Sequence, residues 1–252
     1  MSSKLDLSKE FSGRRALVTG GSRGIGAAIA QRLLDGGAQV AVAARSRSDV
    51  TPAAATFIAG DVRTSEGVKA IASEALAALG GLDILVNNAG GSRVFPEGSA
   101  SIPAEEWQDT FALNLLAAVR LTNAVLPALR ASKAASVINI SSTAATMPFG
   151  PTAHYGAAKA ALDAYSRTLA VELAPSGIRV NVVTPGPVST PSADELRKTF
   201  PGISGDEWLQ WVPLGRLGVP DDIAEVVAML ASDRGAWLTG VNYRVDGGMT
   251  AR

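Results

Sequence analysis

The chain has 252 residues, of which 47% are hydrophobic and 18% charged, enough to build one large α/β domain or two small ones. Lysine plus arginine and aspartate plus glutamate both number 23, and this zero net charge gives no general attraction to nucleic acid or to an anionic membrane. There is no cysteine and only one histidine, which excludes disulfides, thiolate chemistry and an ordinary set of Cys/His metal ligands. The sequence contains no apolar run typical of a signal peptide or a membrane span, so we expect a soluble cytoplasmic protein without a metal site.

A glycine-rich turn follows the first predicted strand. Residues 15–19 are mostly apolar and lead directly into Gly-Gly-Ser-Arg-Gly-Ile-Gly at 20–26, after which the apolar spacing predicts a helix. Glycines here let the backbone turn tightly and approach a diphosphate at the positive end of the helix. Glycines also simply make turns, but the strand before them and the helix after them favour a nucleotide site.

The second predicted strand, residues 39–44, ends in basic residues. Arg45 and Arg47 follow it, and no carboxylate appears before Asp49. Folds selective for NAD usually hold the ribose 2′-hydroxyl with an acidic side chain at this point, whereas an arginine accommodates the 2′-phosphate of NADP. Arg23, inside the glycine-rich turn, could reach the same phosphate. These arginines could also be solvated loop charges, but the missing acid favours NADP over NAD.

The rest of the chain continues the alternation of strands and helices. Further strands are predicted at residues 56–59, 82–86, 136–142, 179–184 and 241–245, and the longest helices at 101–133 and 152–174. Such alternation is typical of a parallel sheet covered on both faces. We therefore expect one α/β domain, residues 1–252, with a doubly wound, seven-stranded Rossmann-type sheet.

Tyr155 and Lys159 are one turn apart at the start of the helix predicted at 152–174, so they share a face. A tyrosine with an ordinary pKa of about 10 is a poor acid or base near neutrality, and a nearby ammonium lowers that pKa. Ser142, at the end of a predicted strand, could hold a carbonyl or hydroxyl oxygen beside this pair. Taken alone, the spacing is more typical of an ordinary core or surface pair.

Other features allow two interpretations each. Asn114 lies within an apolar helix face, as a satisfied core group or as part of a polar relay. Residues 187–219 suit a mobile lid over a substrate, although their aromatic residues serve equally well as packing anchors. Weaker pocket candidates are Phe95, Phe149 and His154, and His154 is better explained as a structural residue.

The motifs together resemble the short-chain dehydrogenase/reductase family over essentially the whole chain. The matching segments are Thr-Gly-x-x-x-Gly-x-Gly at 19–26, Asn-Asn-Ala-Gly at 87–90, a serine at 142 followed thirteen residues later by Tyr-x-x-x-Lys, Asn114, residues 185–190, and Val-Asp-Gly-Gly at 245–248. The resemblance implies hydride transfer between a nicotinamide and a ketone or secondary alcohol. Tyr155 would exchange the proton, Ser142 would orient the substrate oxygen, Lys159 would lower the tyrosine pKa, and Asn114 would support a water chain.

The resemblance also implies where NADP(H) binds. The residues expected around the cofactor are Gly20, Ser22, Arg23, Gly24, Ile25, Gly26, Arg45, Asp61, Val62, Asn88, Ala89, Gly90, Tyr155, Lys159, Pro185, Gly186, Val188 and Thr190. Asp61 and Val62 would flank the adenine, and residues 185–190 would lie against the nicotinamide.

Two departures from the family pattern matter. Only fourteen residues separate Arg45 from Gly60, and they include Pro52, so the helix that many relatives place there is expected to be missing or reduced. Reductases of the oxoacyl carrier-protein type have a basic residue where this chain has Val171, which makes a carrier-protein partner less favoured. A small-molecule substrate is the expected partner.

The helix at 152–174 is apolar nearly all round, so it needs cover on more than one side. The family resemblance indicates a homotetramer built through this helix and its predecessor, and a monomer that covers the helix internally is the alternative. For function, the alternatives are an NAD(H)-dependent alcohol dehydrogenase of the same family and a nucleotide-binding regulatory protein without turnover. A hydrolase is disfavoured because the chain lacks a Gly-x-Ser-x-Gly elbow.

Overall fold

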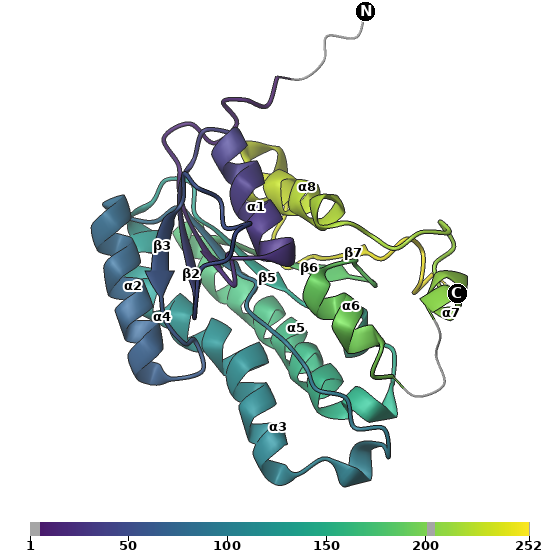
Figure 1. Cartoon of the computed structure of the whole chain (residues 1–252). Helices are drawn as coiled ribbons and strands as arrows, with labels where there is room; N and C mark the ends of the chain where they lie inside the picture. The colour runs from purple at the N-terminus through teal and green to yellow at the C-terminus, as the bar shows by residue number, and fades with distance from the viewer. Residues whose placement is uncertain (1–5, 201–204, 252) are drawn as a thin grey trace, which may run out of the picture.

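The computed structural model describes residues 6–200 and 205–251. Its centre is a sheet of seven parallel strands in the order β3-β2-β1-β4-β5-β6-β7 (Figure 1). The strands are β1 Arg15–Thr19, β2 Gln39–Ala44, β3 Thr56–Ala59, β4 Ile84–Asn87, β5 Ser136–Ile140, β6 Arg179–Pro185 and β7 Asn242–Val245. The predicted seven-stranded parallel sheet is confirmed. Strand order reverses between β1 and β4, the point where ligands bind in such sheets.

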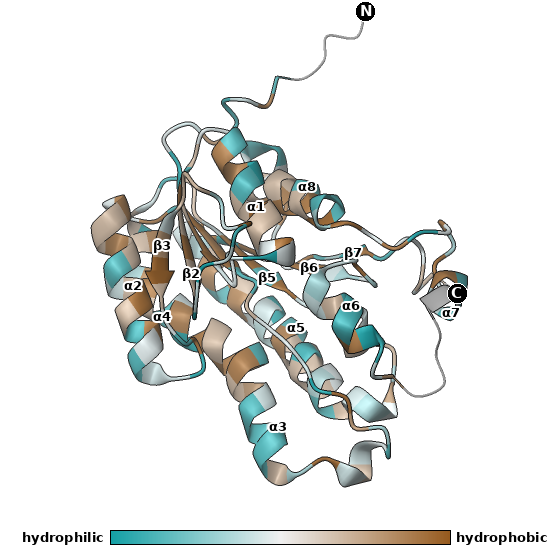
Figure 2. Cartoon of the chain, viewed as in Figure 1, coloured by the Kyte–Doolittle hydropathy of each residue, from teal (hydrophilic) through white to brown (hydrophobic). Residues whose placement is uncertain are grey.

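Helices cover both faces of the sheet. One face carries α1 Gly24–Asp35 and α8 Pro220–Ala231, which pack side by side (Figure 1). The other carries α2 Ser65–Leu79, α4 Ala117–Ala131 and α5 Ala153–Leu173. Successive strand residues alternate between the two cores: Leu17 packs with the second group of helices, whereas Ala16 and Val18 pack with the first. Hydrophobic residues dominate the strands, while the helices mix both kinds (Figure 2).

The helix predicted at residues 101–133 is continuous but irregular. It comprises α3 Ala104–Phe111, a π-helical turn at Ala112–Leu116, and α4. The stretch Ala104–Ala131 is long and apolar enough to cross a membrane by composition, yet α4 packs against α2 and α3 packs against α5 within this fold. The π-helical turn contains Asn114, and such turns occur frequently at functional sites.

The connection between β2 and β3 contains no helix, as expected from its length. Instead, the hydroxyls of Ser48 and Thr51 both donate hydrogen bonds to the carbonyl oxygen of Ser22, which ties this loop to the glycine-rich turn. The segment predicted as a lid contains two short helices, α6 Pro191–Arg197 and α7 Gly205–Gln210. Residues 201–204 of that segment lie outside the described residues.

Candidate active site

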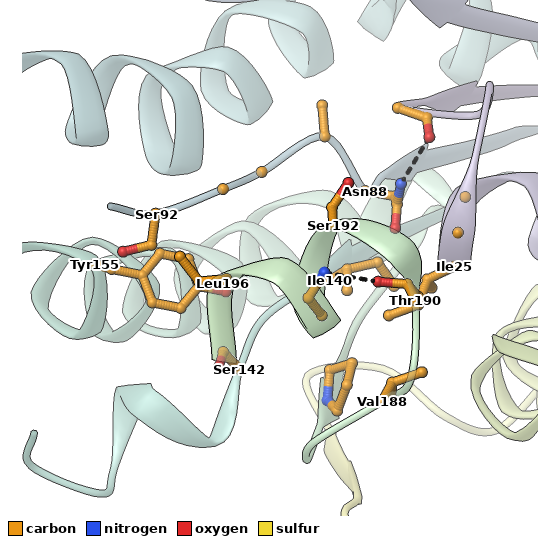
Figure 3. Close-up of a pocket in the computed structure, with 18 of the residues that line it drawn as sticks. Ile25, Asn88, Ser92, Ile140, Ser142, Tyr155, Val188, Thr190, Ser192 and Leu196 are labelled. Atoms are coloured by element: carbon orange, nitrogen blue, oxygen red, sulfur yellow. Dashed lines mark hydrogen bonds between the residues drawn. The ribbon is translucent and has the colours of Figure 1, made fainter. Parts of the chain in front are cut away.

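A cleft of about 1240 Å³ opens at the carboxyl ends of the central strands. The glycine-rich turn lines one end, and Tyr155 and Ser142 line the other (Figure 3). All the residues predicted to bind the cofactor line this cleft. Of the predicted site residues, Asn114 alone is not among those that line it and borders a small adjoining cavity instead. Folding therefore gathers motifs far apart in the sequence around one space.

The glycine-rich turn presents bare backbone to the cleft. Gly20 and Gly24 have φ angles of +66° and +55°, which favour glycine. A Cβ on Gly26 would lie 2.3 Å from the carbonyl oxygen of Gly20, so a side chain there would push the turn open. The N-terminus of α1 follows directly, and its free N–H groups attract an anion. This end of the cleft therefore fits the diphosphate of a dinucleotide.

Asn88 holds two strand ends together. Its side-chain amide donates to the carbonyl oxygen of Thr19 at 2.9 Å, and the backbone N–H groups of Asn88 and Ala89 donate to the Thr19 hydroxyl at 3.0 Å. The polar atoms of this motif thus join the ends of β1 and β4 beside the glycine-rich turn. These hydrogen bonds fix the backbone of the motif, which lines the cleft together with the Asn88 side chain.

Positive charge gathers at the glycine end of the cleft. Arg23 and Arg45 are exposed and line it, whereas Arg47 stacks over the ring of Phe57 at 5.1 Å and is not part of the lining. Asp61 also lines the cleft, but Arg63 pairs with it at 2.8 Å and lowers the pKa of that carboxyl. The carboxylate is thus already neutralised by a partner.

Tyr155 and Lys159 occupy the first two turns of α5. The Lys159 Nζ lies 5.8 Å from the centre of the Tyr155 ring and donates a 2.8 Å hydrogen bond to the carbonyl oxygen of Ile140, the last residue of β5. Ser142 follows β5, and its hydroxyl accepts from the N–H of Ala144 at 3.2 Å. The Ser142 hydroxyl also hydrogen-bonds the Tyr155 hydroxyl. One strand end and one helix start supply all three side chains.

Comparison with known proteins decides the family. The family model described as "Enoyl-(Acyl carrier protein) reductase" matches residues 20–250. An uncharacterized oxidoreductase of Mycobacterium tuberculosis is 40% identical over 93% of this chain and 91% of its own length. The 3-oxoacyl-[acyl-carrier-protein] reductase of Escherichia coli is 39% identical over 95% and 98%. The chain belongs to the short-chain dehydrogenase/reductase family.

A solved structure gives the same answer for the fold of this dehydrogenase/reductase. The ligand-free aldohexose dehydrogenase of Thermoplasma acidophilum superposes with a TM-score of 0.89 and 29% identity, covering 97% of this chain and 96% of its own. The protein is therefore an oxidoreductase of a family whose members use a nicotinamide cofactor. The glycine cradle and the adjoining cleft of this chain fit such a cofactor.

The end of the cleft that holds Tyr155, Ser142 and Lys159 is called the reacting end. The pKa values of its side chains correct the expectation made for Tyr155. Burial raises the pKa of Tyr155 above its ordinary value, and a hydrogen bond with Ser142 opposes that shift. The expectation of a lowered Tyr155 pKa is wrong for this structure, because burial of the phenol dominates, while the Lys159 ammonium is directed at the Ile140 carbonyl. Burial lowers the pKa of Lys159 to about 8, and the charge of Asp163 opposes that shift.

Asp163 is a residue that sequence reasoning missed. Its side chain is buried four residues after Lys159 on the same face of α5. One carboxylate oxygen accepts from the Asn242 side chain at 3.0 Å, and a hydrogen bond with Ser141 also favours the carboxylate. An acid spaced one turn from Lys159 in an apolar helix was the available signal. Other cleft residues carry no motif; Ser92, Met147 and Met249 come from loops and Leu196 from α6.

Asn114 links the π-helical turn to the loop after β4. Its Oδ1 accepts from the N–H of Gly91 at 3.1 Å, and its Nδ2 donates to the carbonyl oxygens of Gly91 at 2.9 Å and Thr110 at 3.0 Å. A cavity of about 10 Å³ lies between Asn114 and Lys159. The structure is compatible with both interpretations of Asn114. Its side chain has hydrogen-bond partners, as a core group needs, and it borders the cavity beside Lys159, as a polar relay needs.

The three weaker pocket candidates differ in their position relative to the cleft. His154 is fully buried, and its ring lies 5.5 Å from Phe95 and 6.1 Å from Trp107, outside the cleft lining. Burial lowers the pKa of His154, so it packs as a neutral core residue. Phe149, in contrast, lines the cleft. Within the described residues, no group of three His, Cys, Asp or Glu side chains is placed to hold a metal ion.

Proposed function

We propose that this protein is an NADP(H)-dependent oxidoreductase acting on a ketone or secondary alcohol, with Tyr155 as the general acid and base. The observation that carries the proposal is one continuous cleft, with a diphosphate cradle at one end and Tyr155, Ser142 and Lys159 at the other. The nicotinamide cofactor, when bound, supplies or accepts the hydride. The chain itself binds, orients and moves the proton.

Proton transfer falls to Tyr155. In carbonyl reduction its hydroxyl donates to the substrate oxygen, and the neighbouring Ser142 hydroxyl donates to the same oxygen and fixes its position. Because burial raises the pKa of Tyr155, the hydroxyl stays protonated at neutral pH, which suits reduction. In alcohol oxidation Tyr155 acts as a phenolate, and its hydrogen bond with Ser142 favours that form.

A route for replacing that proton runs behind the cleft. The cavity between Asn114 and Lys159 measures about 10 Å³, close to the smallest volume that holds one water molecule. Thr19, Asn87 and Asn114 supply polar atoms around it. We assign Asn114 to support a water there that passes protons toward Lys159 and Tyr155.

The preference for NADP(H) rests on charge. Arg23 and Arg45 line the glycine end of the cleft, where a 2′-phosphate would lie. The carboxylate of Asp61 is held by Arg63 and is less available to accept from a ribose 2′-hydroxyl. An arginine pair of this kind binds phosphate through charge-assisted hydrogen bonds.

Replacing Tyr155 by Phe tests the proposal. Tyr155→Phe removes the proton donor and keeps the ring, so we expect the rate of NADPH-dependent reduction of a carbonyl panel to fall by about 10²-fold or more. Cofactor affinity should change little. Tyr165→Phe is the matched control, because Tyr165 lies on the same helix outside the cleft lining. Equal turnover by both variants would refute the role of Tyr155, and a wild-type protein that binds NADPH without any turnover would be the regulatory protein instead.

The second candidate function is reduction of a 3-oxoacyl group carried by a carrier protein. Relatives named as 3-oxoacyl-[acyl-carrier-protein] reductases, 39% identical in one case, favour it. Against it stands Val171 of α5, because the family resemblance places a basic residue at this position in such enzymes. We expect the same 3-oxoacyl thioester to react no faster on the carrier protein than on a small thiol.

A further inference from the structure

Four aromatic rings form a continuous wall along one side of the cleft. The ring centres of Phe149 and Phe200 lie 5.2 Å apart, those of Phe200 and Trp208 5.2 Å, and those of Trp208 and Trp211 5.1 Å. All four residues line the cleft. They come from the loop before α5, the end of the segment after α6, and α7 with the residue that follows it. These aromatic residues therefore serve as packing anchors for one another and also line the space where a substrate would bind.

This aromatic wall lies at the reacting end. Helix α6 begins beside the glycine-rich turn, where the Thr190 side chain is 3.3 Å from the Cβ position of Gly24. The chain then runs along the cleft to Phe200, which packs on Phe149. Figure 3 shows Leu196 of α6 at the same end as Tyr155, away from Ile25. The rings therefore lie beyond the cofactor cradle, toward the end of the cleft that holds Tyr155.

The same end offers no free positive charge among the described residues. Arg197 is one cation near the wall, and its guanidinium donates to the carbonyl oxygen of Val188 at 3.2 Å and pairs with Asp194. Lys159 is buried and donates to Ile140. The other arginines of the cleft, Arg23, Arg45 and Arg63, follow β1, β2 and β3 at the glycine end. A carboxylate or phosphate on the substrate would therefore be desolvated here without a partner.

We infer that the physiological substrate class is uncharged aromatic ketones or the matching secondary alcohols, with the aromatic ring against Phe149, Phe200, Trp208 and Trp211. The inference rests on the function proposed above and adds the substrate class to it. Aromatic pairs prefer tilted and edge-to-face contacts, which the wall already shows between its own rings. In reduction the carbonyl carbon gains a hydride as NADPH is oxidised to NADP⁺, the C=O π bond breaks, and the oxygen takes the Tyr155 proton.

Three matched ketones test the class: 4-phenyl-2-butanone, 2-butanone, and the phenyl compound carrying a para-carboxylate. We expect kcat/KM for the neutral aromatic ketone to exceed that of each of the other two by about 100-fold, mainly through KM, because the ring buries apolar area and the carboxylate finds no partner. Turnover with equal or better values for 2-butanone or the carboxylate would overturn the aromatic class and leave the proposed function standing.

Trp211→Leu tests the wall itself, and Trp237→Leu is the matched control, since Trp237 is 99% exposed outside the cleft. Trp211→Leu should raise KM for the aromatic ketone by about tenfold and leave 2-butanone unchanged, because only the ring contact is lost. Equal losses for both ketones would show a merely structural role and overturn the inference. Phe149→Leu repeats the test if Trp211→Leu fails to fold.

Calorimetric binding separates the inference from the proposed function. Titrating 4-phenyl-2-butanone into protein saturated with NADP⁺ measures binding where no reduction can occur. We expect saturable binding that weakens about tenfold in Trp211→Leu and is unchanged in Trp237→Leu. If this holds while no carbonyl compound is turned over, the aromatic site stands and the proposed function fails. Absence of binding together with turnover of other ketones overturns the aromatic site alone.

Discussion

Lys159 and Asp163 form a buried pair of opposite charges one turn apart on α5, with 3% and 7% of their surface exposed. Burial lowers the pKa of Lys159 to about 8 and raises the pKa of Asp163. Each charge opposes the shift of the other, and Arg167 and the side chains of Ser141 and Asn242 also favour the carboxylate. The lysine beside the reacting tyrosine therefore owes its charge partly to a residue outside the cleft.

A double-mutant cycle of Lys159→Met and Asp163→Asn measures this attraction. At pH 7 Lys159 is mostly protonated and favours the carboxylate form of Asp163, so we expect a favourable coupling of about 0.5–3 kcal/mol in the free energy of unfolding by urea. Lys159 loses its proton as pH rises through about 8, so the coupling should shrink by pH 9.5. Additive losses at pH 7 would show that the two charges do not interact. The single variants are the cycle's own controls.

Arg45 and Arg47 follow the same strand but have different surroundings. Arg45 lines the cleft, whereas Arg47 stacks on Phe57. Arg45→Ala should weaken NADPH binding by about tenfold, because a charge-assisted contact to the 2′-phosphate is lost, and should leave NADH within about twofold. Arg47→Ala should leave the affinities for NADPH and NADH unchanged. Titration by cofactor fluorescence measures all four values, and equal losses of NADPH and NADH in Arg45→Ala would contradict a 2′-phosphate contact.

At this scale the sequence predicts what is local. Tyr155 and Lys159 could be paired because i and i+4 share a helix face, and Ser142 because it ends an apolar strand. The direction of the Tyr155 pKa could not be predicted, because it depends on burial by elements far away in the chain. The different surroundings of Arg45 and Arg47 could not be predicted either, because Arg47 stacks on Phe57, which comes from β3.

Among the elements, the turn between β1 and α1 depends most strongly on close backbone approach. A Cβ on Gly26 would lie 2.3 Å from the Gly20 carbonyl oxygen and 2.4 Å from the Asn88 amide nitrogen. We expect Gly26→Ala to cost about 1–3 kcal/mol in the free energy of unfolding and to weaken cofactor binding, because backbone must move. Gly150→Ala is the control, since its Cβ would be 3.8 Å from its nearest neighbour. Equal stability of the two variants, measured in urea, would show that the turn relaxes freely.

Strands were the most predictable elements, because β-branched and apolar runs between turn residues mark β1, β2 and β5 directly. The π-helical turn at Ala112–Leu116 was not predictable, since one extra residue barely changes the apolar period of a helix. It matters because it positions Asn114 against Gly91. The missing helix between β2 and β3 was predictable from chain length alone.

For the whole molecule, the outer face of α5 is the surface that matters. The helix buries one side against the sheet, but Ala160, Ala164 and Val171 on its other side are exposed, and Leu116 of the π-helical turn is 37% exposed. We propose that a second copy covers this face in a homotetramer, as the family resemblance implies. Because α5 also carries Tyr155 and Lys159, assembly would stabilise the reacting end.

Val171→Glu tests that assembly. A glutamate at this position would be buried without a partner in the proposed interface, so we expect sedimentation velocity to show dissociation to smaller species and a lower thermal midpoint, since an unpaired buried charge costs several kcal/mol. Val50→Glu is the matched control, because Val50 is 64% exposed on the connection between β2 and β3. A wild-type protein that sediments as a monomer at micromolar concentration, or a Val171→Glu protein that keeps the wild-type mass, would exclude an interface through α5.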